Sequence, residues 1–345
     1  MKIAMLGNFS DSQTGLYVLN SFRELGHQTS GTDIRRMYED RGPEECQTIT
    51  LSEMKKLNFY PDIILILKGI ELKLETIKTI KSMYPKAKLV NWFFDKYLGI
   101  KPIWETKEYF DTIREFDFYL CSLKGVSDKL NELGFSNVKF LDEACYPESN
   151  GECYANSFQI KKYGSDVAFI GTIGFTLQHP KRIGYLTRVA KEGFNLKIYG
   201  NVICQPNMCQ SLIELYSNEE AINAKHSIIC TSSLINLGID QDESIESGYS
   251  ARLFRVLCAG GFYLTNYTKN LENYFKINLK DESILDTQEL VVYYSEDDLI
   301  KKLDYLLERP ELIKKIANNG QKTVYEKHKF TDRCNELIKI TEELK

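Results

Sequence analysis

The sequence has no long apolar run and no excess of positive charge. No apolar stretch in its 345 residues reaches the roughly 20 that a membrane-spanning helix needs, so we expect no membrane span. The opening MKIAMLGNFSDSQTG lacks the pattern of a secretory signal. Lys and Arg number 44 against 48 Asp and Glu, a formal net charge of -4. This balance disfavours bulk binding to nucleic acid or anionic membrane, although it leaves room for a local basic patch.

The sequence also lacks the common cysteine and glycine motifs. Its nine cysteines are scattered, with no CxxC pair and no Cys/His cluster at zinc spacing. We therefore expect no metal site and a reduced, cytoplasmic protein whose thiols are mostly buried. The stretch GNFSDSQTG, which follows the first apolar run, lacks the G-x-G-x-x-G pattern of dinucleotide binding. This absence argues against a nicotinamide-dependent oxidoreductase.

Short apolar runs alternate with helix-like segments along the chain. KIAMLG (2–7) and PDIILILKG (61–69) predict buried parallel strands, and LYVLNSFRELG has helical spacing with Gly26 as its stop. Such alternation predicts parallel sheets covered by helices. We expect two doubly wound α/β domains, over 1–150 and 160–325, because the segment 146–164 loses periodicity and gathers Gly, Ser, Asn and Pro.

The same patterns predict the individual elements. In the first half the remaining strands are expected at 88–95, 116–122 and 138–147, with helices at 74–85 and 125–134. In the second half, strands are expected at 165–172, 195–200, 227–236, 262–266 and 291–295, helices at 182–193, 211–226 and 251–261, and two further helices split by Pro310.

The stretch SGYSARLFRVLCAGGFYLTN carries two arginines three residues apart. Arg252 and Arg255 fall on one face of the predicted helix, and Ser250 is placed to cap its N-terminus. Helix N-termini with a neighbouring arginine bind anions such as phosphate. The alternative is that both arginines are solvated or paired with acids such as Glu243 and Glu246. Ligands of doubly wound sheets bind outside the carboxyl ends of the strands, where the loop before this helix is expected to lie.

Several short motifs follow one another in a fixed order. They are DVAFIGT (166–172) with Arg182, IYG (198–200), INL (235–237), SARLF (250–254), AGGFYLT (259–265), VVYYS (291–295), IANNG (316–320), His328 and Arg333, and more faintly MKIAMLGNF, LGH (25–27), PDIILIL and NWFFDK. In order and spacing they resemble the CgeB-like (spore maturation protein) glycosyltransferases. The resemblance covers most of the chain. It implies a GT-B fold, with two Rossmann-like domains facing a central cleft and a last helix, over 326–345, that packs back on the first domain.

The resemblance also implies an activity. A sugar would pass from a nucleotide-sugar donor to a hydroxyl group of a glycan, a small molecule or a macromolecule, without a cofactor or metal. Cations and helix N-termini would then stabilise the departing phosphate. On the donor side the candidates are Gly171, Thr172, Arg182, Tyr199, Gly200, Asn236, Ser250, Arg252 and Arg255.

Acceptor activation needs a carboxylate or histidine that takes the proton of the acceptor hydroxyl in an inverting reaction. Asp95, at the end of NWFFD, is the candidate base, with a helix cap or loop turn as its alternative role. The loop after the first strand, with Asn8, Thr14 and Gly15, is the other candidate on the acceptor side.

One position departs from the family pattern. The family has Glu after the Phe of the S-x-R-x-F-E helix, and in many GT-B enzymes such an acid accepts hydrogen bonds from the ribose. Arg255 stands here instead, and an arginine cannot accept hydrogen bonds. Either ribose recognition or the donor differs, Arg255 meets a second phosphate or an acidic sugar, or the site has decayed. Two alternatives to an ordinary transferase therefore stay open: sugar transfer to hydroxymethylated DNA bases, and nucleotide-sugar binding without catalysis.

Overall fold

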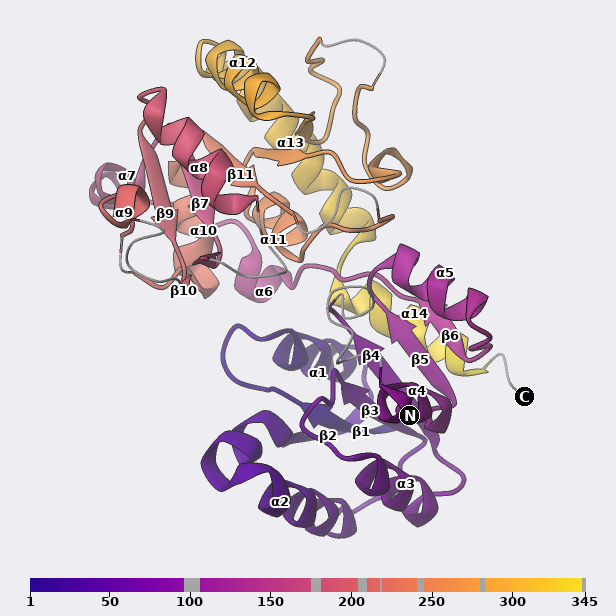
Figure 1. The fold of residues 1–345 in the computed structure, drawn as a ribbon. Helices are drawn as coiled ribbons and strands as arrows, with labels where there is room; N and C mark the ends of the chain where they lie inside the picture. The colour runs from indigo at the N-terminus through magenta and orange to yellow at the C-terminus, as the bar shows by residue number, and fades with distance from the viewer. Residues whose placement is uncertain are drawn as a thin grey trace. The chain divides into compact units, whose positions relative to one another are not determined.

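The computed structural model describes residues 1–95, 106–174, 181–203, 210–217, 219–240, 245–279 and 283–342 of the chain. These residues form two compact units (Figure 1). Unit 1 contains Met1–Glu143 and Phe330–Lys345, and unit 2 contains Ala144–Lys329. None of the helices in the described ranges is both long enough and apolar enough to cross a membrane.

Unit 1 is built on a parallel sheet of six strands. They are β1 (Lys2–Gly7), β2 (Gln28–Asp33), β3 (Ile63–Leu67), β4 (Lys88–Phe93), β5 (Phe118–Cys121) and β6 (Val138–Phe140). The spatial order is β2-β1-β3-β4-β5-β6, so the chain changes direction across the sheet between β1 and β3. β3 is the unbroken apolar segment IILIL, and all five of its residues are buried. Burial on both faces explains why an apolar run without alternation forms this central strand.

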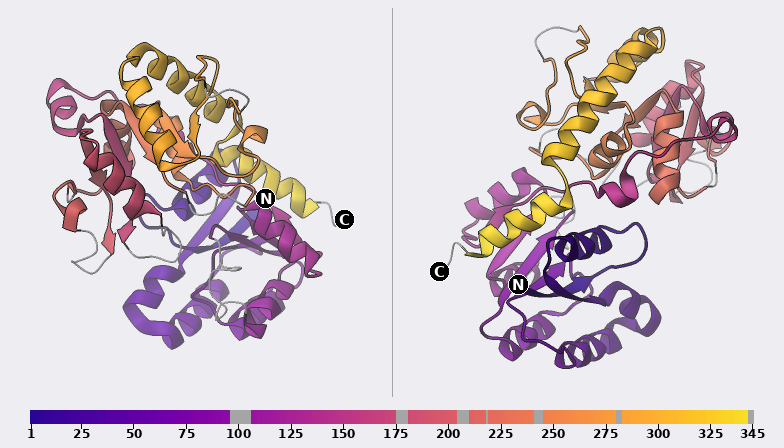
Figure 2. Two further views of the ribbon diagram at one scale, coloured as in Figure 1. Left: turned by 45° about the horizontal axis from the view of Figure 1, so that its top comes forward. Right: turned by 180° about the vertical axis from the view of Figure 1, so that it is seen from behind.

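Helices cover the sheet of unit 1. They are α1 (Thr14–Glu24), α2 (Ile34–Lys55), α3 (Leu74–Met83), α4 (Lys107–Glu115), α5 (Lys124–Glu132) and α14 (Phe330–Glu342). The last of these packs along α1 (Figure 2). The ring of Phe330 contacts those of Tyr17 and Trp92, with centroids 6.2 and 6.1 Å away, and Cys334 Sγ approaches the carbonyl of Val18. The final helix is therefore part of the core of unit 1.

Unit 2 repeats the strand order. Its strands are β7 (Val167–Ile170), β8 (Ile173–Gly174), β9 (Leu196–Tyr199), β10 (Val202–Ile203), β11 (Ile235–Gly238), β12 (Tyr263–Asn266) and β13 (Val291–Tyr293). Five of them form a parallel sheet in the order β13-β12-β11-β7-β9, and β8 pairs with β10 separately. Here the change of direction lies between β7 and β11.

The helices of unit 2 include several short ones. They are α6 (Pro147–Asn150), α7 (Ser157–Tyr163), α8 (Arg182–Lys191), α9 (Gln210–Ile213), α10 (Asn223–Ser232), α11 (Arg252–Ala259), α12 (Glu296–Leu307) and α13 (Pro310–Lys327), with a 3₁₀ turn at Leu271–Asn273. α11 ends at Gly260, whose φ of 83° is the left-handed conformation that favours glycine, and the chain turns directly into β12. The long helix α13 packs along α11 (Figure 2).

Some sequence-based expectations about the elements were wrong. The expected strand over 227–236 is helical up to Ser232, and only β11 beyond it is extended. The expected helix over 211–226 is confined to Gln210–Ile213 and the start of α10. The change between units falls at Glu143–Ala144 and not in 146–164, and that segment holds α6 and α7.

Candidate functional site

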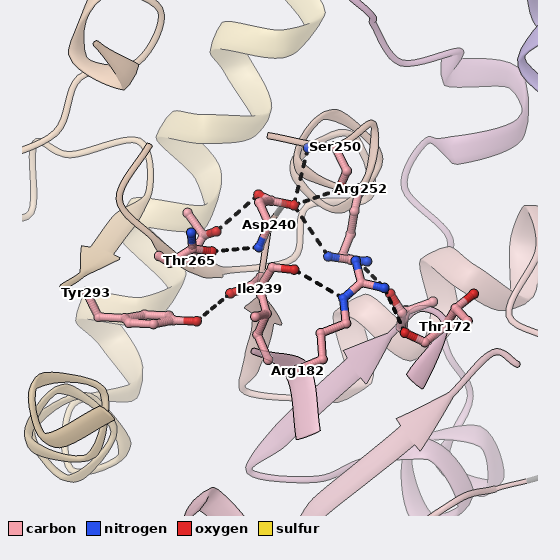
Figure 3. A network of polar contacts seen from close by, with 11 residues as sticks. Thr172, Arg182, Ile239, Asp240, Ser250, Arg252, Thr265 and Tyr293 are labelled. Carbon is pink, nitrogen blue, oxygen red and sulfur yellow. Dashed lines mark hydrogen bonds and ion pairs between the residues drawn. The ribbon is translucent and has the colours of Figure 1, made fainter. Parts of the chain in front are cut away.

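The carboxyl ends of β7 and β11 form the candidate site of unit 2. These two strands are neighbours, and the order of the sheet reverses between them. Helices that follow such strands start on opposite faces, which leaves a crevice at this edge where ligands of doubly wound folds bind. Arg182, the first residue of α8, and Arg252, the first residue of α11, both reach this edge (Figure 3).

Arg182 links the two strands. Its Nε donates to the carbonyl of Ile239, 3.2 Å away and just beyond β11, and its Nη1 donates to the carbonyl of Thr172, 2.7 Å away and just beyond β7. The residue is only 2% exposed. Burial, and then the positive charge of Arg252, lower the pKa of Arg182 to about 9. Because that value still exceeds neutral pH, the guanidinium remains charged.

Arg252 approaches the same edge from α11. Its Nε donates to the carbonyl of Ile170 at 2.5 Å, and its Nη1 lies 3.7 Å from Asp240 Oδ1. Within the described residues, this buried Nη1 has no hydrogen-bond partner. Arg182 and Arg252 share the ring of Phe169, with Cζ atoms 5.4 and 5.0 Å from its centroid. A cation–π contact of this kind stabilises each guanidinium beside the ring.

Asp240 is the buried acid that faces Arg252. Its side chain is fully buried, and Oδ1 accepts hydrogen bonds from the backbone N–H and the hydroxyl of Ser250, at 3.2 and 2.8 Å. The expectation that Ser250 caps the helix was wrong, because α11 has no side-chain cap and Ala251 occupies the cap position. The serine instead fixes the carboxylate that faces Arg252 (Figure 3). The second oxygen, Oδ2, accepts from the Thr265 hydroxyl at 3.4 Å.

Among the residues that the structure describes, the charges at this edge do not cancel. Two guanidinium groups share one carboxylate, and Arg252 disfavours the charge on Arg182. Like charges held together in a place of low dielectric attract an anion, since an anion relieves their repulsion and supplies the missing hydrogen-bond acceptor. The arrangement can therefore bind a phosphate or diphosphate.

Two glycines let the backbone come close to Arg252. A Cβ on Gly171 would lie 2.5 Å from Arg252 Nη2, and one on Gly200 would lie 2.6 Å from the carbonyl oxygen of Gly171. Gly200 also has a φ of 115°. Thr172 follows Gly171 and contributes its carbonyl to Arg182. The predicted residues Gly171, Thr172 and Gly200 thus lie together beside the arginines.

Tyr199 and Asn236 lie below this surface. Tyr199 is 1% exposed, its hydroxyl is 3.4 Å from the carbonyl of Tyr163, and burial raises its pKa. The amide nitrogen of Asn236 donates to the carbonyls of Cys230 and Phe262, at 2.9 and 3.2 Å. Both side chains connect elements of the core, so as predicted donor ligands they are positioned to support the site and not to face it.

Arg255 lies on the side of α11 that faces α10. Its side chain is half-buried. The positive charge of Arg255 acts on the buried His226: burial first, and then the charges of Arg255 and Arg252, lower the pKa of this histidine to about 3. His226 is therefore neutral. Of the acids considered as partners from sequence, Glu246 instead binds Asn270 and Tyr274, and Glu243 lies outside the described residues.

In unit 1 the predicted base Asp95 follows β4. Its Oδ2 is 2.7 Å from Nζ of Lys68, which follows β3, and the aspartate side chain is 26% exposed. Lys68 has a φ of 58°, its N–H donates to the carbonyl of Trp92, and its own carbonyl accepts from the Asn91 amide at 3.0 Å. Asp95 is thus held at the carboxyl edge of the sheet by a cation from the neighbouring strand.

The other acceptor-side residues lie where the order of this sheet reverses, after β1. Asn8 Oδ1 accepts from the N–H of Ser10 at 3.0 Å, and α1 begins at Thr14. A Cβ on Gly15 would lie 2.2 Å from the carbonyl oxygen of Asn8, so only glycine lets α1 start so close to β1. This loop and Asp95 are at the same edge of the sheet.

Sequence reasoning missed Asp240 and Phe169. Asp240 follows the last glycine of an unremarkable strand, and Phe169 reads as an ordinary core residue. The one local signal for Asp240 is its place two residues after this strand, in the stretch SLINLGID (233–240). In the part of the chain that the structure describes, no group of three His, Cys, Asp or Glu side chains is placed to hold a metal ion.

A comparison with protein families matches residues 182–339, slightly less than half of the chain, to a family described as "Glycosyl transferase-like". The match begins at Arg182 and includes Asp240 and Arg252. No curated protein is significantly similar in sequence.

Solved structures are similar over the whole chain. Sucrose-phosphate synthase from Thermosynechococcus elongatus has a TM-score of 0.67 at 8% identity, covering 100% of this chain and 99% of its own. An α-glucosyltransferase in complex with UDP and a DNA containing an HMU base has a TM-score of 0.67 at 11% identity, covering 99% of both chains. UDP-GlcNAc 2-epimerase from Neisseria meningitidis, bound to UDP-GlcNAc, has a TM-score of 0.55 at 13% identity, covering 99% and 100%. The prediction of two Rossmann-like α/β domains, with GT-B glycosyltransferases as structural neighbours, is confirmed.

Proposed function

We propose that the protein is a glycosyltransferase, of the CgeB-like kind, that transfers a sugar from a nucleotide-sugar donor to a hydroxyl acceptor. The observation that carries the donor half is the pair Arg182–Arg252 on Phe169, with one buried carboxylate that faces Arg252. The match of residues 182–339 to a glycosyl transferase-like family supports it. The solved neighbours that hold UDP or UDP-sugars support a nucleotide sugar as the anion.

In this proposal the diphosphate of the donor lies at the carboxyl ends of β7 and β11. Nη1 of Arg252, which has no hydrogen-bond partner among the described residues, meets a phosphate oxygen. Gly171 allows the phosphate to approach the backbone next to it. As the bond between the anomeric carbon and the phosphate oxygen breaks, the negative charge on the leaving group grows, and the two guanidinium groups stabilise it. Protein cations, without a metal ion, carry this role.

The acceptor half rests on Asp95. In an inverting reaction the acceptor hydroxyl gives its proton to the carboxylate, and its oxygen forms the new bond to the anomeric carbon. Lys68 keeps the Asp95 carboxylate in place through its 2.7 Å ion pair. Neighbouring Asn8, Thr14 and Gly15, at the same edge of the unit 1 sheet, are proposed to contact the acceptor.

The first test is a thermal-shift screen against UDP-, GDP-, CMP- and dTDP-sugars, with calorimetry on any hit. A ligand at 100 times its dissociation constant stabilises the fold by about 2.7 kcal/mol, which such a screen detects. A selective hit, followed by release of the nucleotide (a nucleoside diphosphate, or CMP from a CMP-sugar) that persists in EDTA, is the expected result. Silence with all four nucleotides would contradict donor binding, and loss of turnover in EDTA would contradict the metal-free mechanism.

A second candidate acceptor is a hydroxymethylated base in DNA. One similar structure is of an α-glucosyltransferase bound to a DNA containing an HMU base. The net charge of -4 weighs against it. Incubation of the identified donor with a duplex that carries hydroxymethylated bases decides the matter, since sugar on the DNA supports this acceptor and its absence removes it.

Binding without transfer is the third candidate. It is favoured by Arg255, which stands where the family resemblance has a glutamate. Donor binding by calorimetry with neither hydrolysis nor transfer to any acceptor would support it.

A further inference from the structure

Unit 1 contains a hollow of about 440 Å³ that the proposed donor site does not use. It lies beside β4 and β5, under α4 and the first turns of α3. Much of its wall is apolar and aromatic, from the side chains of Ile77, Phe93, Tyr109, Ile113, Phe116 and Tyr119. The rings of Phe93 and Tyr119 are stacked, with centroids 6.0 Å apart and planes 21° apart. Apolar, ring-lined hollows of this size are typical of small-molecule sites.

One buried polar group in this wall is only half satisfied. Asn91, 2% exposed, donates through its Nδ2 to the carbonyl of Lys68 at 3.0 Å. Its Oδ1 has no hydrogen-bond partner in the part of the chain that the structure describes. Buried amide oxygens are almost always paired, so a ligand N–H or O–H is the partner that this atom lacks.

The hollow is connected to the proposed base through a single residue. Lys68 lines the hollow and holds Asp95 at 2.7 Å. A molecule whose apolar body fills the hollow therefore has its polar end near the lysine and close to the carboxylate that the lysine positions. This is the orientation that an acceptor with one reactive hydroxyl requires.

We propose that this hollow binds the aromatic ring system of the acceptor, with Asn91 Oδ1 accepting a hydrogen bond from a donor group on the ring. The identification of that ligand as the acceptor rests on the proposed function; the binding itself does not. The volume is about three times the roughly 150 Å³ of an apolar cavity that holds benzene, so two or three fused rings fit. We expect a free monosaccharide to bind less well than an aromatic ring, because the isoleucine and phenylalanine side chains of the wall cannot bond its hydroxyl groups.

Two variants test the hollow directly. Thr112→Trp places a large ring into it from α4, and Asn91→Leu removes the amide at nearly constant volume. Thr79→Trp is the matched control: Thr79 lies exposed on α3 outside the hollow, and both threonine hydroxyls donate to the carbonyl four residues earlier. Urea unfolding of each variant verifies that it is folded.

The measurement is calorimetric titration with 2-naphthol and indole, with methyl glucoside as the sugar control. We expect both aromatic probes to bind the wild type and the Thr79→Trp variant equally, methyl glucoside not to bind, and Thr112→Trp to weaken binding about tenfold or more. Asn91→Leu should weaken 2-naphthol by about fivefold or more. No binding to the wild type, or binding that Thr112→Trp leaves unchanged, would overturn the proposal.

Nucleotide-sugar binding is measured on the same samples. Because the proposed donor residues belong to unit 2, the Thr112→Trp variant should bind the nucleotide hit as the wild type does. Aromatic binding without any nucleotide hit would support the aromatic site in unit 1 and contradict the proposed function. A nucleotide hit without aromatic binding would support the donor half of the proposed function and contradict the aromatic site.

Discussion

Arg182 and Arg252 lie on one phenylalanine ring, and each bonds a carbonyl at the end of a different strand: Arg182 at Ile239 beyond β11, and Arg252 at Ile170 of β7. The two strands are those between which the sheet reverses. The arginines thus connect the ends of the two strands across the crevice, and they also give the crevice its positive charge. An anion that enters meets groups already fixed in place, so little side-chain entropy is lost on binding.

Removal of one of these guanidinium groups tests the donor site. Arg252→Ala should weaken binding of the nucleotide hit by about 1.5–3 kcal/mol, because a charge-assisted hydrogen bond is lost. Calorimetry measures the change. Arg188→Ala is the control, since Arg188 is on the same helix as Arg182 but pairs with Glu192 and Asp297 at the surface. An unchanged dissociation constant in Arg252→Ala would remove this arginine from the site.

Loss of the proposed base should affect turnover and not donor binding. Asp95→Asn keeps the shape of the side chain but cannot take a proton, so the rate should fall by about 10²–10⁴-fold. Asp40→Asn, an exposed aspartate paired with Arg36, is the control. Full activity in Asp95→Asn would mean that another group takes the proton.

The close approach of Gly200 to Gly171 predicts a stability difference between two glycines. Gly193→Ala and Gly200→Ala both place a Cβ at positive φ, which costs about 1–2 kcal/mol, but only at Gly200 does the Cβ meet backbone, 2.6 Å from Gly171 O. The free energy of unfolding in urea should therefore fall by about 1–3 kcal/mol more for Gly200→Ala. Equal losses would show that the loop moves aside without cost.

The buried His226 predicts how stability depends on pH. Its pKa falls from an ordinary 6.5 to about 3 in the folded protein, chiefly through burial. Below pH 6.5 the unfolded chain takes up a proton at this residue and the folded one does not, so stability decreases as the pH falls from 6.5 toward 3. The slope is about 1.4 kcal/mol per pH unit at most.

Urea unfolding between pH 7.5 and 5 measures this slope in the wild type and in His226→Gln. The variant should have a shallower pH dependence, whatever its absolute stability. His27→Gln is the comparison, because His27 is only half-buried, whereas His226 is buried. The same slope in His226→Gln and the wild type would mean that other groups cause the acid sensitivity.

Sequence patterns predicted the buried strands well, because a short, unbroken apolar run such as IILIL is stable in a central strand that is buried on both faces. They missed β2 (QTSGTD), a polar edge strand that gains its structure from pairing with β1. They also mistook SIICTS for a strand. Its β-branched residues favour extension, but His226, Ile229 and Cys230 share one helical face that α10 buries.

At the site, sequence found both arginines but not what holds them. Arg182 and Arg252 stood out through motif and position. Their shared ring, Phe169, comes from a segment about 80 residues before Arg252, next to Ile170, and the carboxylate is that of Asp240. Nothing local at Phe169 or Asp240 encodes those partners, and they appear only once the strands are adjacent.

The return of α14 to unit 1 affects the order in which the protein is made. Phe330 and Cys334 complete the core around Tyr17, Val18 and Trp92. On the ribosome, the first 143 residues emerge long before this helix. Unit 2 is one continuous segment, and its synthesis is complete before that of α14 begins. The amino-terminal unit is therefore the one that finishes folding last. Until Phe330 has been synthesised, the rings of Tyr17 and Trp92 lack one of the partners that they have in the folded protein.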